Sequence, residues 1–172
     1  MRDKNLSLKL LSFVPAILIM IMIFAFSAED SDESSSTSRS FTKSVISAVD
    51  VSFNLELTKE EVENTVEKFE HLIRKMAHYT EYMLLGISIF IPLFLFYVKG
   101  HTVYLISSFF CFFYASTDEF HQLFIDGRSA SPKDVLLDTC GAVTGILIVG
   151  LFCKLRANKV YVSANNKISS SI

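Results

Sequence analysis

Long apolar runs alternate with polar stretches along the whole chain, and four of these runs are long enough to be membrane helices. They lie at about residues 10–28, 72–98, 102–124 and 132–155. A helix needs about 20 apolar residues to cross the roughly 30 Å hydrocarbon core of a bilayer. The pattern therefore predicts an all-α polytopic membrane protein, a four-transmembrane-helix bundle. We expect one membrane domain over residues 1–157.

The segment between the first two runs, residues 29–71, predicts an amphipathic and soluble helical outer loop. Its serine-rich start, residues 31–40, is typical of a flexible tether. Apolar residues then recur at helical spacing from Phe41 to Val49, which predicts a short amphipathic helix. Thr58 followed by Glu61 is a capping box, so one helix should begin there and continue into the second span.

The two ends of the chain differ in charge from this loop. From Glu29 to Glu70 there are eleven acidic and four basic residues, whereas both termini are basic. Basic segments stay on the cytoplasmic side of a membrane, so both termini are expected in the cytoplasm of a bacterial cell, and Lys99 in the second loop agrees. The polar tail, residues 158–172, is expected to be disordered.

Composition narrows the class of protein further. Half of the residues are hydrophobic, sixteen are Phe, and the net charge is only −2. A nearly neutral, apolar chain of this kind predicts the lipid bilayer as a partner and no nucleic acid. The first run could be a cleaved signal peptide, because Ala25-Phe26-Ser27 resembles a cleavage site. Its apolar core exceeds the usual length of about 7–15 residues, which favours an uncleaved helix.

Two histidine–carboxylate clusters interrupt these apolar runs. Ionisable groups inside a membrane are costly unless they face protein or water, so they usually mark a functional site. Helical spacing places them on one stripe of each of the last three spans, at a similar depth near the outer surface. The candidate catalytic residues are His78, Glu81, Asp118, His121 and Asp138, and the candidate substrate-binding residues are Lys75, Tyr82, Glu119, Gln122, Arg128 and Asp134.

The chemistry of these residue types suggests a division of roles. His78 and His121 titrate near neutral pH and suit acid–base catalysis, while Glu81 and Asp138 would orient them. Lys75 and Arg128 could hold a phosphate. The pairs His78-x-x-Glu81 and Asp118-x-x-His121 also have the spacing that helical bundles use for metals, although the nearby lysine disfavours a cation site. We therefore expect no metal and no cofactor.

Structural roles are the alternative for several of these residues. Arg74 and Lys75 could anchor their helix at the lipid headgroups, and Asp134 could be a first-turn helix acid after the cap Ser131-Pro132. The His/carboxylate cluster as a whole could be a network of structural hydrogen bonds. On the last span, Gly141 and Gly145 form a Gly-x-x-x-Gly spacing, which predicts close approach of a second helix.

In combination, these motifs resemble the VanZ-like family of bacterial integral membrane proteins, named after a member linked to teicoplanin resistance. The resemblance rests on Lys75-x-x-His78-x-x-Glu81-Tyr82, Asp118-Glu119-x-His121-Gln122, Arg128 and Asp134-x-x-x-Asp138-x-x-Gly141, with Phe26-Ser27-Ala28-Glu29 at the end of the first span. Glu29 stands where the family pattern has Gln. The resemblance implies a four-helix membrane protein with a shared polar site.

Three functions fit this reading. One is a protein that contributes to glycopeptide resistance or envelope remodelling by binding a lipid-linked cell-wall precursor, a phospholipid headgroup or a glycopeptide. Another is an enzyme that modifies an outer-leaflet lipid or precursor. The last is a small proton-coupled transporter, which the apolar inner halves of the spans disfavour. The sequence leaves open whether the protein is an enzyme.

Overall fold

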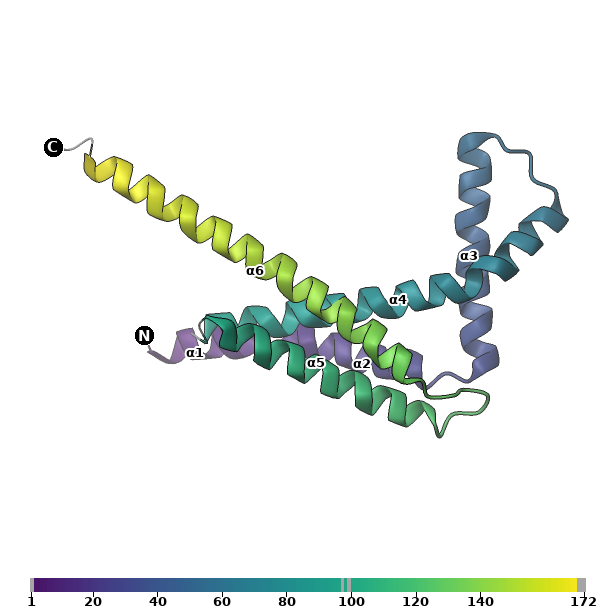
Figure 1. The fold of residues 1–172 in the computed structure, drawn as a ribbon, viewed down its shortest axis with the longest axis horizontal. Helices are drawn as coiled ribbons and strands as arrows, with labels where there is room; N and C mark the ends of the chain where they lie inside the picture. Colours follow the sequence, from purple (N-terminus) through teal and green to yellow (C-terminus); the bar gives the residue numbers. More distant parts are fainter. Residues whose placement is uncertain (1, 97, 99, 170–172) are drawn as a thin grey trace.

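The structure is a computed structural model, which describes residues 2–96, 98 and 100–169. Within these residues every regular element is a helix, which confirms the all-α prediction. The helices are α1 (Arg2–Leu11), α2 (Val14–Ser27), α3 (Ser31–Phe53), α4 (Lys59–Leu95), α5 (His101–Gln122) and α6 (Pro132–Ser169). Figure 1 shows α1, α2, α4 and α5 running along one direction, α6 crossing them obliquely, and α3 lying across one end.

Length and composition identify three membrane-spanning candidates among the described residues. They are Leu6–Ser27, which joins α1 and α2, then Lys59–Leu95 and Pro132–Arg156. The expected span at 102–124 forms α5, but polar residues at both of its ends lower its hydropathy. Four spans are therefore not clearly marked by composition alone, although α5 packs against both α4 and α6.

The closest helix pair is α4 with α6, and glycines make this contact. A Cβ on Gly141 would lie 2.3 Å from the backbone oxygen of Tyr79, and one on Gly145 would lie 2.2 Å from that of Met83. From the other side, a Cβ on Gly86 would lie 2.3 Å from the backbone oxygen of Ala142. The two backbones thus touch directly, as the Gly-x-x-x-Gly spacing predicted.

The segment between the first two spans differs in part from the sequence prediction. The serine-rich stretch is not a flexible tether, because α3 is a single helix that already begins at Ser31. Asp30 caps it by accepting a hydrogen bond from the backbone N–H of Glu33 (2.8 Å), and acidic residues in the first turn stabilise a helix start. The capping box of Thr58 and Glu61 is confirmed, as is the continuous helix α4 that follows it.

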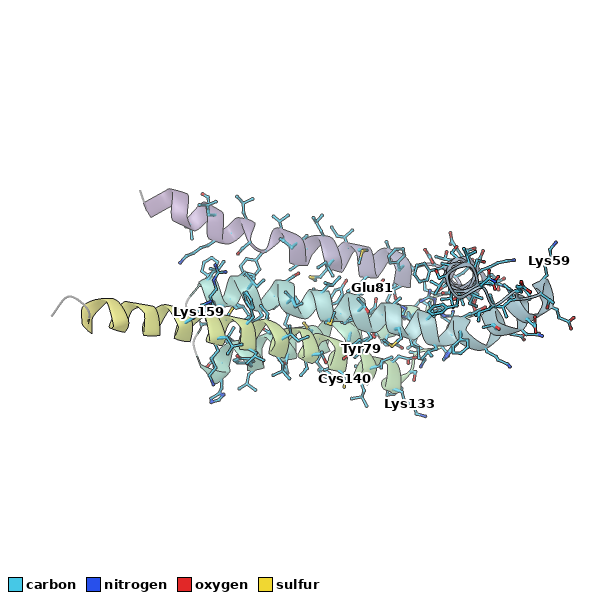
Figure 2. All side chains as sticks on the ribbon, turned by 90° about the horizontal axis from the view of Figure 1, so that it is seen from above. Lys59, Tyr79, Glu81, Lys133, Cys140 and Lys159 are labelled. Atoms are coloured by element: carbon cyan, nitrogen blue, oxygen red, sulfur yellow. The ribbon has the colours of Figure 1, made fainter. Side chains whose placement is uncertain are left out.

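The two ends of the chain lie at the same end of the bundle, away from α3 (Figure 1). Lys59 and Lys159 mark the opposite ends in Figure 2, where α3 is seen almost end-on. Beyond the expected end of the last span, the backbone of residues 158–169 continues α6 instead of forming a disordered tail. No Pro or Gly interrupts this part of the chain, and a helix that already exists extends without a new nucleation cost.

Candidate functional site

A polar cavity of about 240 Å³ lies at the end of the bundle nearest to α3. Its walls come from α4, the end of α5, the loop after it and the start of α6. Seven of the eleven residues that the sequence singled out line it: Lys75, His78, Glu119, Gln122, Arg128, Asp134 and Asp138. Three separate predicted stripes therefore converge on one space.

An ion pair between α4 and α6 closes one side of the cavity. Lys75 Nζ donates a hydrogen bond to Asp134 Oδ1 at 2.5 Å, and the two side chains are about one-third exposed, at 36% and 32%. Ser131 caps α6 directly before, with its backbone oxygen accepting from the N–H of Asp134 at 2.9 Å. Asp134 is thus both a first-turn helix acid and the partner of Lys75.

Two arginines face the cavity from different elements. Arg74, on α4, lies 3.9 Å from Glu70 and donates a long hydrogen bond (3.5 Å) to Ser35 of α3. Arg128, in the loop after α5, donates to the backbone oxygen of Phe26 at 3.1 Å. Burial, and then the positive charge of Arg74, lower the pKa of Arg128. The two guanidinium groups therefore repel each other across the cavity, which favours an anion between them.

His78 lies at the inner edge of the cavity, beside Glu81 one turn further along α4. His78 Nδ1 is 3.6 Å from Glu81 Oε2, too far for a hydrogen bond, and both side chains are largely buried. Neither atom has another hydrogen-bond partner among the described residues. This pair of buried polar atoms is poised to bind a ligand or to exchange a proton with one.

Two buried carboxylates lie near Glu81. Asp138 is 3% exposed, and its Oδ1 atom has no hydrogen-bond partner in the described part of the chain. Asp118 is 5% exposed and accepts a hydrogen bond of 3.4 Å from Gln122, which also donates to Ser27 of α2 at 2.9 Å. Asp138 interacts electrostatically with Asp118 and Glu81, so the acids of three helices lie close together.

Glu119 has a structural partner. Its Oε2 accepts a hydrogen bond of 2.7 Å from the backbone N–H of Ser131, and the side chain is nearly buried. The carboxylate at the end of α5 therefore fixes the start of α6. This role was hidden in the sequence, where Glu119 lies off the stripe of Asp118 and Gln122.

The other predicted site residues lie outside the cavity. Tyr82 is fully buried in the apolar core, with its ring centroid 6.2 Å from that of Tyr114. His121 stacks on Phe24 of α2, with ring centroids 4.8 Å apart. Successive residues on a helix point about one-third of a turn apart. His121 therefore faces Phe24 of α2, while the next residue, Gln122, lines the cavity.

Two cavity residues were missed or assigned another role from the sequence. His71 lines the cavity, as does Arg74, which the sequence treats as a headgroup anchor. Both lie on the helical stripe that already contains Lys75 and His78, one or two turns nearer the start of α4. Extending that stripe toward the start of α4 would have found them.

An apolar groove of about 650 Å³ adjoins the polar cavity and lies between α3 and α4. Arg74 and His78 line both spaces, so the groove and the cavity meet at these two side chains. The remaining walls are mainly apolar and include Phe26, Phe41, Val45, Met76, Ala77 and Leu84, with Glu29 and Glu81 at the α2 and α4 sides.

No group of three His, Cys, Asp or Glu side chains is arranged to hold a metal ion within the described ranges. The histidine–carboxylate pairs on α4 and α5 do not share one metal site, because His121 faces α2.

A helical bundle with apolar spans and a polar pocket at one end defines an integral membrane protein of the polytopic α-helical class. The model of the VanZ/LLP1 family matches residues 12–153, which is most of the chain. The chain belongs to this family. No curated protein and no solved structure matches it significantly.

Proposed function

We propose that this protein works in the bacterial cell envelope, where its polar cavity binds a component of the outer leaflet and so contributes to glycopeptide resistance of the teicoplanin kind or to envelope remodelling. One observation carries the proposal. Arg74, Lys75, His78 and Arg128 gather in a cavity at the end of an otherwise apolar bundle. Ionisable groups near the membrane hydrocarbon cost free energy, so their collection in one cavity favours a binding or chemical role over a purely structural one.

The proposed topology has four spans, with α5 as the third to cross the membrane. α5 packs against both α4 and α6 and exposes a row of phenylalanines, among them Phe109 and Phe113, which suits contact with lipid. The basic termini lie at the end of the bundle opposite the cavity, so cytoplasmic termini place the cavity on the outer side. A reporter enzyme fused after Lys159 should then be active only in its cytoplasmic form. Activity of an extracytoplasmic reporter at the same point would overturn this orientation.

The resistance proposal is tested with a pair of histidine variants. His78→Ala removes a cavity residue, whereas His121→Ala removes a histidine that stacks on Phe24 outside the cavity. In a teicoplanin-sensitive host, the wild type and His121→Ala should raise resistance and His78→Ala should not. Membrane abundance is matched first, because a truncated polar side chain at this depth can destabilise the bundle. Equal resistance of all three proteins would remove the cavity from the function.

An acid–base enzyme acting on a lipid or lipid-linked precursor is the second candidate, and the His78–Glu81 pair favours it. A histidine beside a carboxylate can accept and return a proton. Incubation of the purified protein with labelled lipids and precursors separates the two candidates, because only an enzyme releases product. Product that is formed by the wild type and by His121→Ala, but not by His78→Ala, would establish catalysis.

A further inference from the structure

Resting on the proposed envelope function, we infer that the ligand is a membrane glycerophospholipid, with its phosphate in the polar cavity and one acyl chain in the groove between α3 and α4. Arg74 and His78, which line both spaces, lie at the junction between headgroup and chain.

The size of the cavity selects a small headgroup. A volume of about 240 Å³ equals that of about eight water molecules, at roughly 30 Å³ each. This space holds a phosphate together with a three-carbon alcohol. A disaccharide–peptide of a cell-wall precursor is several times larger and would extend out of the cavity.

The charges inside the cavity favour a phosphate. Asp134 is paired with Lys75, and Glu119 is held by the N–H of Ser131. Arg74 keeps only a long ion pair with Glu70, at 3.9 Å, and Arg128 donates to the backbone oxygen of Phe26, so these two cations still repel each other. A phosphodiester can accept hydrogen bonds from both guanidinium groups at once, which relieves the repulsion. The free Oδ1 of Asp138 can accept a hydrogen bond from a headgroup hydroxyl.

The groove matches an acyl chain in length as well as in chemistry. From Arg74 to Leu84 the lining follows α4 over ten residues, or about 15 Å at 1.5 Å per residue. One leaflet contributes about half of the roughly 30 Å hydrocarbon core, which is the same length. Phe41 and Val45 of α3 lie along the end nearer to the headgroup, and Phe26 and Leu84 belong to the bundle. A chain that enters at Arg74 therefore reaches the midplane inside the groove.

A second apolar groove of about 970 Å³ provides an internal control. It runs along α5 between residues such as Phe109 and Phe113, and no charged residue lines it. It should accept lipid tails without preference for a headgroup. Filling this groove should leave capture of a phospholipid by the cavity unchanged.

The test measures lipid retained by the purified full chain in detergent, using native mass spectrometry. The probes are phosphatidylglycerol, a diacylglycerol with the same chains, glycerol phosphate and undecaprenyl phosphate. One copy of phosphatidylglycerol should bind in preference to the other probes, and at that site the probes that lack the phosphate or the chain should bind at least about tenfold more weakly. Equal retention of diacylglycerol, equal binding of glycerol phosphate, or a preference for undecaprenyl phosphate would each overturn the inference.

Three variants locate the binding site. Arg128→Gln should weaken phosphatidylglycerol binding about tenfold, because one charged donor to the phosphate is lost. Ala77→Phe, which fills the groove beside α3, should weaken it by a similar factor, whereas Ser108→Phe in the α5 groove should not. Unchanged binding in both Arg128→Gln and Ala77→Phe would overturn the inference. If lipid binding fails these tests while His78→Ala still abolishes resistance, the inference falls and the proposed function stands.

Discussion

The direct contact between the backbones of α4 and α6 leads to a sharp prediction for Gly141→Ala. The added methyl carbon would lie 2.3 Å from the backbone oxygen of Tyr79, whereas ordinary van der Waals contact begins at about 3.4 Å. The helices must therefore separate by about 1 Å, since a carbonyl in the middle of a helix cannot rotate away. Gly141 lies one turn from Asp138, so this shift also moves the α6 wall of the cavity.

The same substitution at Gly150 is the matched control. A Cβ there would also lie 2.3 Å from its nearest atom, but that atom is the hydroxyl oxygen of Tyr104, at the far end of a flexible side chain. Both variants gain about 1 kcal/mol of helix propensity. Gly141→Ala loses about 1–3 kcal/mol to overpacking, so its net effect is a loss of up to about 2 kcal/mol. Gly150→Ala should be neutral or slightly stabilising.

A thiol-reactive dye can report this difference during thermal unfolding in detergent. Cys111 is buried, whereas Cys140 is exposed and Cys153 is partly exposed. In a Cys140→Ser, Cys153→Ser background, only exposure of Cys111 produces signal, and Gly141→Ala should react at a lower temperature than Gly150→Ala. Equal unfolding temperatures for the two glycine variants would refute the direct backbone contact.

Three further predictions concern the polar parts of the molecule. Thr58→Ala should destabilise the start of α4 by about 1 kcal/mol, seen as faster amide hydrogen exchange over its first turn. A double-mutant cycle on Lys75 and Asp134 should give a coupling of about 0.5–1 kcal/mol in the thiol-dye assay, because the pair is partly exposed. The hydrogen bond from Arg39, and then its charge, lower the pKa of Glu63, in the polar first half of α4, below its usual 4.5. The stabilisation of the folded state that this lowered pKa represents is present above pH 4.5 and is lost as the pH falls further. Protection of α3 amides from exchange, corrected for the intrinsic rate at each pH, should therefore fall below pH 4 in the wild type but not in Arg39→Gln.

Periodicity and local chemistry predicted much of the fold. The capping box marked the start of α4, and the glycine spacing on α6 marked its contact with α4. On α5, the predicted stripe that carries Asp118 and Gln122 lies on the buried face. Each of these features depends on residues three or four apart on one helix, which sequence spacing reports directly.

Features that depend on contacts between helices were not predictable in this way. The serine-rich half of α3 has weak helix propensity, and its helix is supported by Arg39, which forms ion pairs with Glu63 and Glu70 of α4. The direction in which His121 points depends on where α2 packs. Sequence spacing alone predicts the direction of a side chain on a helix only to within about a quarter of a turn. The same limit hid the hydrogen bond from Ser131 to Glu119.

The loop at residues 123–131 is short and polar, so it looks like a natural place to insert an epitope tag. Its backbone is nevertheless joined to the junction of α2 and α3, where the N–H of Ser31 donates to the Asp126 carbonyl at 3.2 Å and Arg128 reaches Phe26. Gly127 passes so close to Ser31 that a Cβ there would lie 2.7 Å away. A tag placed here would separate α2 from α5 and open the cavity. The turn at residues 54–57 hydrogen-bonds to Asp50 at the end of α3, so it is the better site for a tag that tests the proposed orientation in intact cells.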